Sequence, residues 1–170
     1  ATNGGGRLIW DDTQDVVELA NETLGSASSS WSVSVSDRNF YKIKFYLEAN
    51  GDPGTATLAP NIASPSNIDS ASIYNSTSTE SFSVNDQCSI NPGSGGDERN
   101  LSGTIEINAA STTQIFYDMT TINYRNNLFP EKFEIVCTGP NPTINHWVFN
   151  TPGAGDWTTN SRIIIYGSKI

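Results

Sequence analysis

The sequence predicts an all-β fold, an antiparallel two-sheet jelly-roll sandwich with long polar loops. Apolar residues alternate with polar residues in many short runs, which is the period of a strand with one buried face. Segments with glycine and proline separate these runs at intervals of about 8–12 residues, as in sandwiches and barrels. Only 16% of the residues are charged, and Ser, Thr, Asn and Gly supply the remaining polarity. This composition favours strands and turns over helices.

The length of 170 residues fits one domain with one core. Residues 1–6 (ATNGGG) have no large side chain to anchor them, so we expect a flexible N-terminal arm there. We assign residues 7–170 to a single β-sandwich domain. Within residues 7–25, a helix capped by Asp12 competes with a strand. The strand is favoured because polar and apolar residues alternate along VELANET at 17–23.

Two plainly alternating runs follow, SWSVSVS at 30–36 and FYKIKFYLE at 40–48. Each predicts a strand with one buried face. The segment NGDPG at 50–54 has the residues of a turn, and TATLAP at 55–60 then forms the returning strand. The residues expected in the core are Trp31, Val33, Val35, Tyr41, Ile43, Phe45 and Leu47.

Residues 60–100 are dominated by Ser, Asn, Pro and Gly, which predicts loops with short strands at the apolar residues 73–74 and 82–84. The alternating pattern returns in the second half. The total is about ten short strands, with no convincing helix of ten or more residues. The later strands are expected within residues 102–109, 113–124, 132–139, 144–151 and 162–167.

The last of these strands, RIIIYG, contains an unbroken apolar run near the end of the chain. Such a strand is expected to be buried on both faces or paired centrally in its sheet. Ile163, Ile164, Ile165 and Ile170 would each contribute about 1.5–3 kcal/mol if fully buried.

The net charge of −9 argues against a sequence-independent nucleic-acid binder, because that mode needs clustered Lys and Arg. Negative charge also repels anionic membrane surfaces, and no run approaches the roughly 20 apolar residues that span a bilayer. We therefore expect no nucleic-acid partner and no membrane partner.

The sequence contains no recognisable catalytic or metal-binding set. His146 is the only histidine, it lies within a predicted strand, and no GxSxG motif supplies a nucleophile. No acidic segment has the spacing of a calcium-binding EF-hand loop. We expect no enzymatic activity and no cofactor or metal. The acidic groups that come nearest to a metal site are Asp11, Asp12 and Asp15, then Asp52, and then Asp97 with Glu98.

Cys88 and Cys137 are 49 residues apart, which excludes a CxxC redox or zinc spacing. Two readings stay open, a disulfide that closes a long loop and two packed thiols.

Trp157 lies in the polar segment GAGDWTTN at 153–160 and is the tryptophan best placed as a candidate sugar contact. Sugar-binding proteins place an exposed aromatic ring under the apolar face of a sugar, and polar side chains bind its hydroxyl groups. Asp156 and Asn160 would supply those polar groups. The competing interpretation is that Trp157 packs over the last strand.

Several segments, in the same order along the chain, resemble small jelly-roll structural proteins of tailed bacteriophages. They are LANETLGSASSSWSVSV (19–35), FYKIKFYLEANGDPGTATL (40–58), SGTIEI (102–107) and GDWTTNSRIIIYGSKI (155–170). The resemblance implies a head decoration, head-fibre or tail-associated protein on the virion surface, often trimeric and without catalytic residues.

This resemblance leads to the expected function, a virion structural protein that self-associates on the particle surface. Its partners would be copies of itself, as a trimer, and capsid or tail proteins bound through the N-terminal arm. Tyr117, Tyr124 and Phe129 are candidate self-association residues, because identical subunits bury spare aromatic groups. The alternative is a carbohydrate-binding module or adhesin of a secreted or surface protein, and a virion protein could also bind host glycans.

Overall fold

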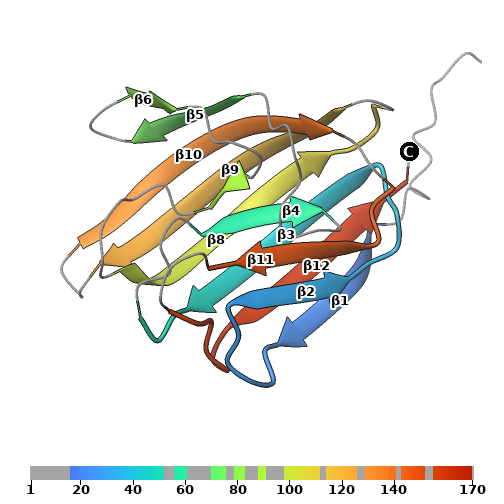
Figure 1. Ribbon diagram of the computed structural model, residues 1–170. Helices are drawn as coiled ribbons and strands as arrows, with labels where there is room; N and C mark the ends of the chain where they lie inside the picture. The colour runs from blue at the N-terminus through green and yellow to red at the C-terminus, as the bar shows by residue number, and fades with distance from the viewer. Residues whose placement is uncertain are drawn as a thin grey trace, which may run out of the picture.

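The computed structural model describes residues 16–51, 56–60, 70–75, 79–82, 88–90, 98–111, 114–125, 129–140, 143–151 and 155–169. These residues contain twelve β-strands and no helix, which confirms the all-β prediction (Figure 1). None of their segments is a helix that could cross a membrane. The N-terminal arm, residues 1–6, lies outside the described residues.

The first six strands are β1 (Val17–Thr23), β2 (Ser30–Ser34), β3 (Phe40–Glu48), β4 (Thr57–Pro60), β5 (Ser70–Asn75) and β6 (Thr79–Phe82). The others are β7 (Cys88–Ser89), β8 (Glu98–Asn108), β9 (Gln114–Arg125), β10 (Phe129–Pro140), β11 (His146–Asn150) and β12 (Arg162–Ser168).

The strands form two antiparallel sheets that face each other as a sandwich. The larger sheet has eight strands in the order β1-β12-β3-β8-β9-β10-β5-β6, and the smaller has four in the order β2-β11-β4-β7. In Figure 1 the smaller sheet lies in front of β1, β12, β3 and β8, and β10, β5 and β6 extend beyond it. The two-sheet prediction is therefore confirmed.

Strand β12 lies between β1 and β3, so the C-terminal strand is paired along both edges as expected for a central strand. Ile163 and Ile165 are fully buried. Ile164 is only half-buried, so of the two expected arrangements central pairing is the one found, and Ile170 lies outside the described residues. The partial burial of Ile164 follows from the period of a strand, because alternate residues point to opposite faces and only one face meets the other sheet.

The core lies between the sheets and is built from the residues in the inward phase of each strand. All the core residues expected in β2 and β3 are buried, except Val35 after β2, which is partly buried and packs against the core. Trp147 on β11 is fully buried, and its ring meets Tyr41 and Tyr117 edge-to-face at 5.4 and 6.1 Å between centroids. Such edge-to-face pairs add about 0.5–1.5 kcal/mol beyond the buried area.

The strand expected to return after the turn at 50–54 does not pair with β3. Strand β4 instead belongs to the smaller sheet, where it pairs with β11 and β7. The physical reason is that β3 already has β12 along one edge and β8 along the other, so it has no free edge for β4. The returning strand is therefore present, but it enters the smaller sheet.

Candidate functional site: a hollow on the outer face of the larger sheet

Trp157, the candidate sugar contact, lies inside the protein. Its side chain is 0% exposed, and its Nε1 group donates a hydrogen bond to the carbonyl oxygen of Phe149 at 3.4 Å. Its backbone forms β-bridges with Ser28, which lies between β1 and β2, and with Ala49, which directly follows β3. A ring with no exposed surface cannot stack on a sugar, so the structure supports the packing interpretation instead.

The two polar residues predicted beside Trp157 help to fix the loop before β12 to the end of β3. Asp156 and Asn50 bind each other, since the Asn50 backbone N–H donates to the Asp156 carbonyl at 3.0 Å and the Asp156 N–H donates to the Asn50 side-chain oxygen at 2.8 Å. The Asn160 amide donates to Glu48 Oε1 at 3.0 Å. Both residues thus have partners within the fold.

Tyr117, a predicted self-association residue, is 2% exposed and packs on Trp147. Burial raises the pKa of its phenol, because the ionised form would lose its hydration. This side chain belongs to the core, which corrects its assignment to a subunit interface. Tyr124 on β9 and Phe129 on β10 have backbones in the larger sheet, but their side chains lie outside the described part.

The two cysteines are described only in their backbones. Cys88 lies opposite Leu58 in the smaller sheet, and Cys137 lies opposite Tyr117 in the larger sheet. Leu58 and Tyr117 are both core residues. The register therefore places both cysteines opposite core positions, one in each sheet.

His146 is half-buried on β11, opposite Ser34 of β2. Asp11, Asp12, Asp15, Asp52 and Asp97 lie outside the described residues, and Glu98 is described only in its backbone. In the part of the chain that is described, no three His, Cys, Asp or Glu residues are grouped as metal ligands.

The structure instead contains a hollow on the face of the larger sheet that points away from the smaller sheet. We call it the outer hollow, and its volume is about 450 Å³. It spans β12, β3, β8 and β9, and Val16 at the start of β1 closes one side. Its lining side chains in the outward phase are Phe40, Lys42, Glu106, Asn108, Phe116, Asp118, Tyr166 and Ser168.

Strand register sorts these side chains into two rows that run across the sheet. In the first row, Asn108 pairs with Phe40 on one side and with Phe116 on the other. Adjacent strands are about 4.8 Å apart, so the backbones of the two phenylalanines stand roughly 10 Å apart, with Asn108 on the strand between them. Phe116 is 45% exposed and Val16 is 68% exposed. This row makes the apolar side of the outer hollow.

The second row is charged. Glu106 pairs with Lys42 of β3 and with Asp118 of β9. The Lys42 ammonium contacts Glu106 Oε1 at 2.7 Å, and both side chains are well exposed. Like charges directly opposite each other destabilise a sheet, so the single ammonium offsets only part of the repulsion between the carboxylates. The row makes the polar side of the outer hollow, with two acids and one base.

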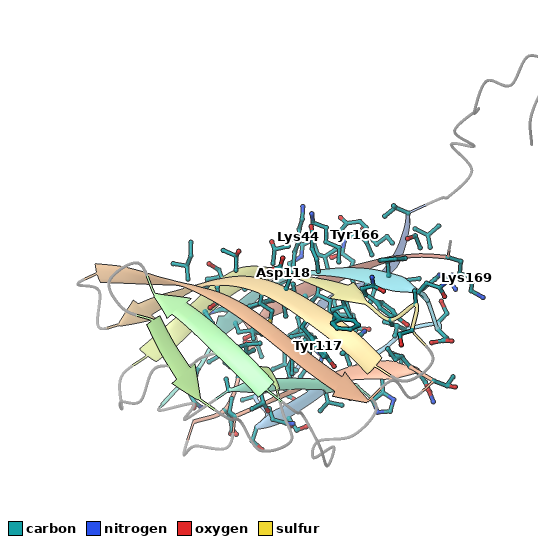
Figure 2. All side chains as sticks on the ribbon, turned by 90° about the horizontal axis from the view of Figure 1, so that it is seen from above. Lys44, Tyr117, Asp118, Tyr166 and Lys169 are labelled. Atoms are coloured by element: carbon teal, nitrogen blue, oxygen red, sulfur yellow. The ribbon has the colours of Figure 1, made fainter. Side chains whose placement is uncertain are left out.

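Tyr166 closes the end of the charged row on β12, opposite Lys42. The ammonium of Lys44 lies 5.9 Å from the centre of the Tyr166 ring, a distance at which a cation is attracted to the ring face. Figure 2 shows Lys44, Asp118 and Tyr166 on the outer side of the larger sheet and Tyr117 on its inner side. The tyrosine ring is therefore held in place by a neighbouring strand.

Sequence reasoning missed the outer hollow because its residues occupy the polar phase of strands whose apolar phase forms the core. The signal that could have found it is the presence of Phe40, Phe116 and Tyr166 in that polar phase. Single exposed aromatic residues are common, but several that come together on one sheet face indicate an interaction surface or a ligand site. No protein-family model, curated protein or solved structure matches the chain.

Proposed function

We propose that this chain is a virion structural protein, a jelly roll that self-associates on a particle surface as a capsid decoration, head-fibre or tail-associated protein. The observation that carries the proposal is the pairing of its strands. The first four strands pair in nested order with later ones, β1 with β12, β2 with β11, β3 with β8 and β4 with β7.

Nested antiparallel pairs describe one long hairpin. When such a hairpin is rolled up, its strands alternate between two sheets, and β1 to β4 do alternate between the larger and the smaller sheet. The pairs β12–β3 and β11–β4 then close the roll in each sheet. This is the arrangement expected of a jelly roll, an architecture used by viral capsid and lectin domains. The hairpins β5–β6 and β9–β10 widen one sheet of the roll.

Composition and segment order add support. The net charge of −9 favours solubility at the high local concentration of a particle surface. The segments that resemble phage structural proteins fall on β1 to β4, β8 and β12, which are all strands of the nested set. In the proposal, the partners are copies of this chain, as a trimer, and capsid or tail proteins held by residues 1–6.

The direct test is to look for the protein on particles. Particles purified from the source culture should contain the chain in many copies, by quantitative mass spectrometry, and antibodies against it should label their surface by immunogold electron microscopy. A chain found only free in the supernatant would contradict the proposal.

A second candidate function is carbohydrate binding, either by a secreted module or adhesin or by a virion protein that also recognises host glycans. This candidate no longer rests on Trp157. It is favoured by the outer hollow, where exposed aromatic and polar side chains stand together on one sheet face.

A further inference from the structure

We infer that the outer hollow binds one neutral pyranose ring, such as the terminal hexose or N-acetylhexosamine of a glycan. The inference rests on the second candidate function and gives it a site and a ligand class. It holds equally for a virion protein and for a secreted module, because the residues concerned all lie within one chain.

The outer hollow has the size and rigidity of a small-molecule site. Its volume of about 450 Å³ falls in the range of about 300–1,000 Å³ that ligand pockets occupy. Its lining comes from four adjacent strands, each paired along both edges in the larger sheet. Sites built on strands keep their side chains better placed than sites on loops, so little ordering is needed on binding.

The apolar side of the hollow suits the C–H face of a pyranose. Phe116 is 45% exposed and faces Phe40 across Asn108, so an aromatic surface is available on the solvent side of the sheet. Sugars present such a face because their ring hydrogens point to one side, and aromatic rings cover it favourably. The Asn108 side-chain oxygen already accepts a hydrogen bond from the Ala110 N–H at 3.0 Å, which fixes the orientation of this side chain.

The polar side suits the hydroxyl groups of the same ring. Glu106 and Asp118 are carboxylates that accept hydrogen bonds, and the Lys42 ammonium donates them. A pair of adjacent sugar hydroxyls can donate to one or both carboxylates and accept from the lysine. These hydrogen bonds would also reduce the repulsion between the Glu106 and Asp118 carboxylates, which the Lys42 ammonium offsets only in part.

Charge selects a neutral sugar over an acidic one. The lining carries two carboxylates and one ammonium, and the whole chain carries a net charge of −9. A sialic acid or a hexuronic acid would bring a further carboxylate into this field and be repelled. The proposed ligand is therefore a neutral pyranose.

The test is saturation-transfer difference NMR on the full-length protein, which suits weak binding at any size of assembly. The probes are methyl β-D-glucopyranoside, methyl β-D-galactopyranoside and the methyl glycoside of N-acetylglucosamine, with methyl β-D-glucuronide as the acidic counterpart. At least one neutral glycoside should bind with a millimolar dissociation constant, and the glucuronide should bind more weakly than the glucoside.

Three variants locate the site. Phe116→Ala should weaken binding at least about tenfold, because it removes the exposed aromatic surface. Tyr46→Ala is the matched control, since Tyr46 is a 40% exposed aromatic residue on the same sheet face that does not line the hollow, and it should change binding less than about twofold. Asp118→Asn should bring the affinities of glucuronide and glucoside closer together.

The inference is overturned if no neutral glycoside binds, or if Phe116→Ala and Tyr46→Ala change binding equally. It is also overturned if Phe116→Ala breaks up an assembly while wild-type protein binds no sugar, because a second copy of the chain then covers the hollow. Sedimentation of the same samples separates the two proposals, since sugar binding can be lost while the assembly stays intact.

Discussion

Replacing Trp157 by alanine tests most sharply whether this residue belongs to the core or to a ligand site. The indole is 0% exposed and donates to Phe149, so its removal leaves a cavity between the two sheets and an unused carbonyl. Buried Trp-to-Ala changes cost about 3–5 kcal/mol. In a domain of this size that loss lowers the melting temperature by roughly 6–20 °C.

The backbone bridges should survive the substitution and limit the damage to the side chain. The Ser28 and Trp157 backbones exchange two hydrogen bonds, at 3.1 and 2.9 Å, which alanine can also make. Trp157→Phe keeps most of the apolar volume, so we expect a loss of about 1–2 kcal/mol. Urea unfolding followed by far-ultraviolet circular dichroism measures both values without relying on tryptophan fluorescence.

Tyr46→Ala serves as the surface control and should cost less than about 1 kcal/mol. If Trp157→Ala also costs less than about 1 kcal/mol, the indole is not packed in the core. The reasoning about the loop before β12 would then be refuted, and Trp157 would return as a candidate ligand contact.

Three further predictions follow from the core. Gly103→Ala should cost about 1–3 kcal/mol in urea unfolding, because the new Cβ would lie 2.5 Å from the Thr120 carbonyl oxygen and 2.7 Å from Phe45. Gly25→Ala is the control, since a Cβ there has nothing within 4 Å, and it should change stability by less than about 0.5 kcal/mol. Equal costs would contradict the close packing around Gly103. Burial raises the pKa of Tyr41 to about 12, above the value of about 10 for an unfolded tyrosine. The stability that Tyr41 contributes is therefore complete below pH 10 and is lost as the pH rises towards 12, so urea midpoints should fall across that window. Tyr41→Phe should reduce the fall, and an unchanged slope would refute the burial of this phenol. Cys88 and Cys137 lie opposite core residues, one in each sheet, so native protein should take up little iodoacetamide, and unfolded, reduced protein should take up two equivalents; rapid uptake by the native protein would contradict this register.

The alternating strands were predictable from sequence because their pattern has a direct physical cause. In β3, every second residue from Tyr41 to Leu47 is buried, as the period of two requires. The run at Ile163–Ile165 likewise indicated a central strand, and β12 does lie between two neighbours. In β3 the local pattern alone determines which face meets the core, whereas in β12 the unbroken apolar run indicates only the central position.

Pairing partners could not be predicted in the same way. The turn residues at 50–54 indicate a reversal of the chain but not which sheet the chain enters next. That choice depends on β8 and β12, which occupy both edges of β3 and come much later in the sequence. Long-range competition for a strand edge leaves no local signal.

Trp157 was named as a candidate sugar contact for a related reason. Trp157 has glycine, aspartate and asparagine neighbours that are typical of an exposed loop, yet its backbone bridges to Ser28 and Ala49 hold it in the core. Phe116 and Phe40 looked like ordinary strand residues, and only the register across β8 brings them to the same row. Exposure of an aromatic residue is a property of the assembled sheet.

We propose above that this chain is a subunit of a larger assembly of identical copies. Native mass spectrometry of the full-length protein, over a range of concentrations, tests it most directly. The account predicts a dominant species of three times the chain mass of 18.4 kDa. A protein that remains at 18.4 kDa at every concentration would contradict the claim.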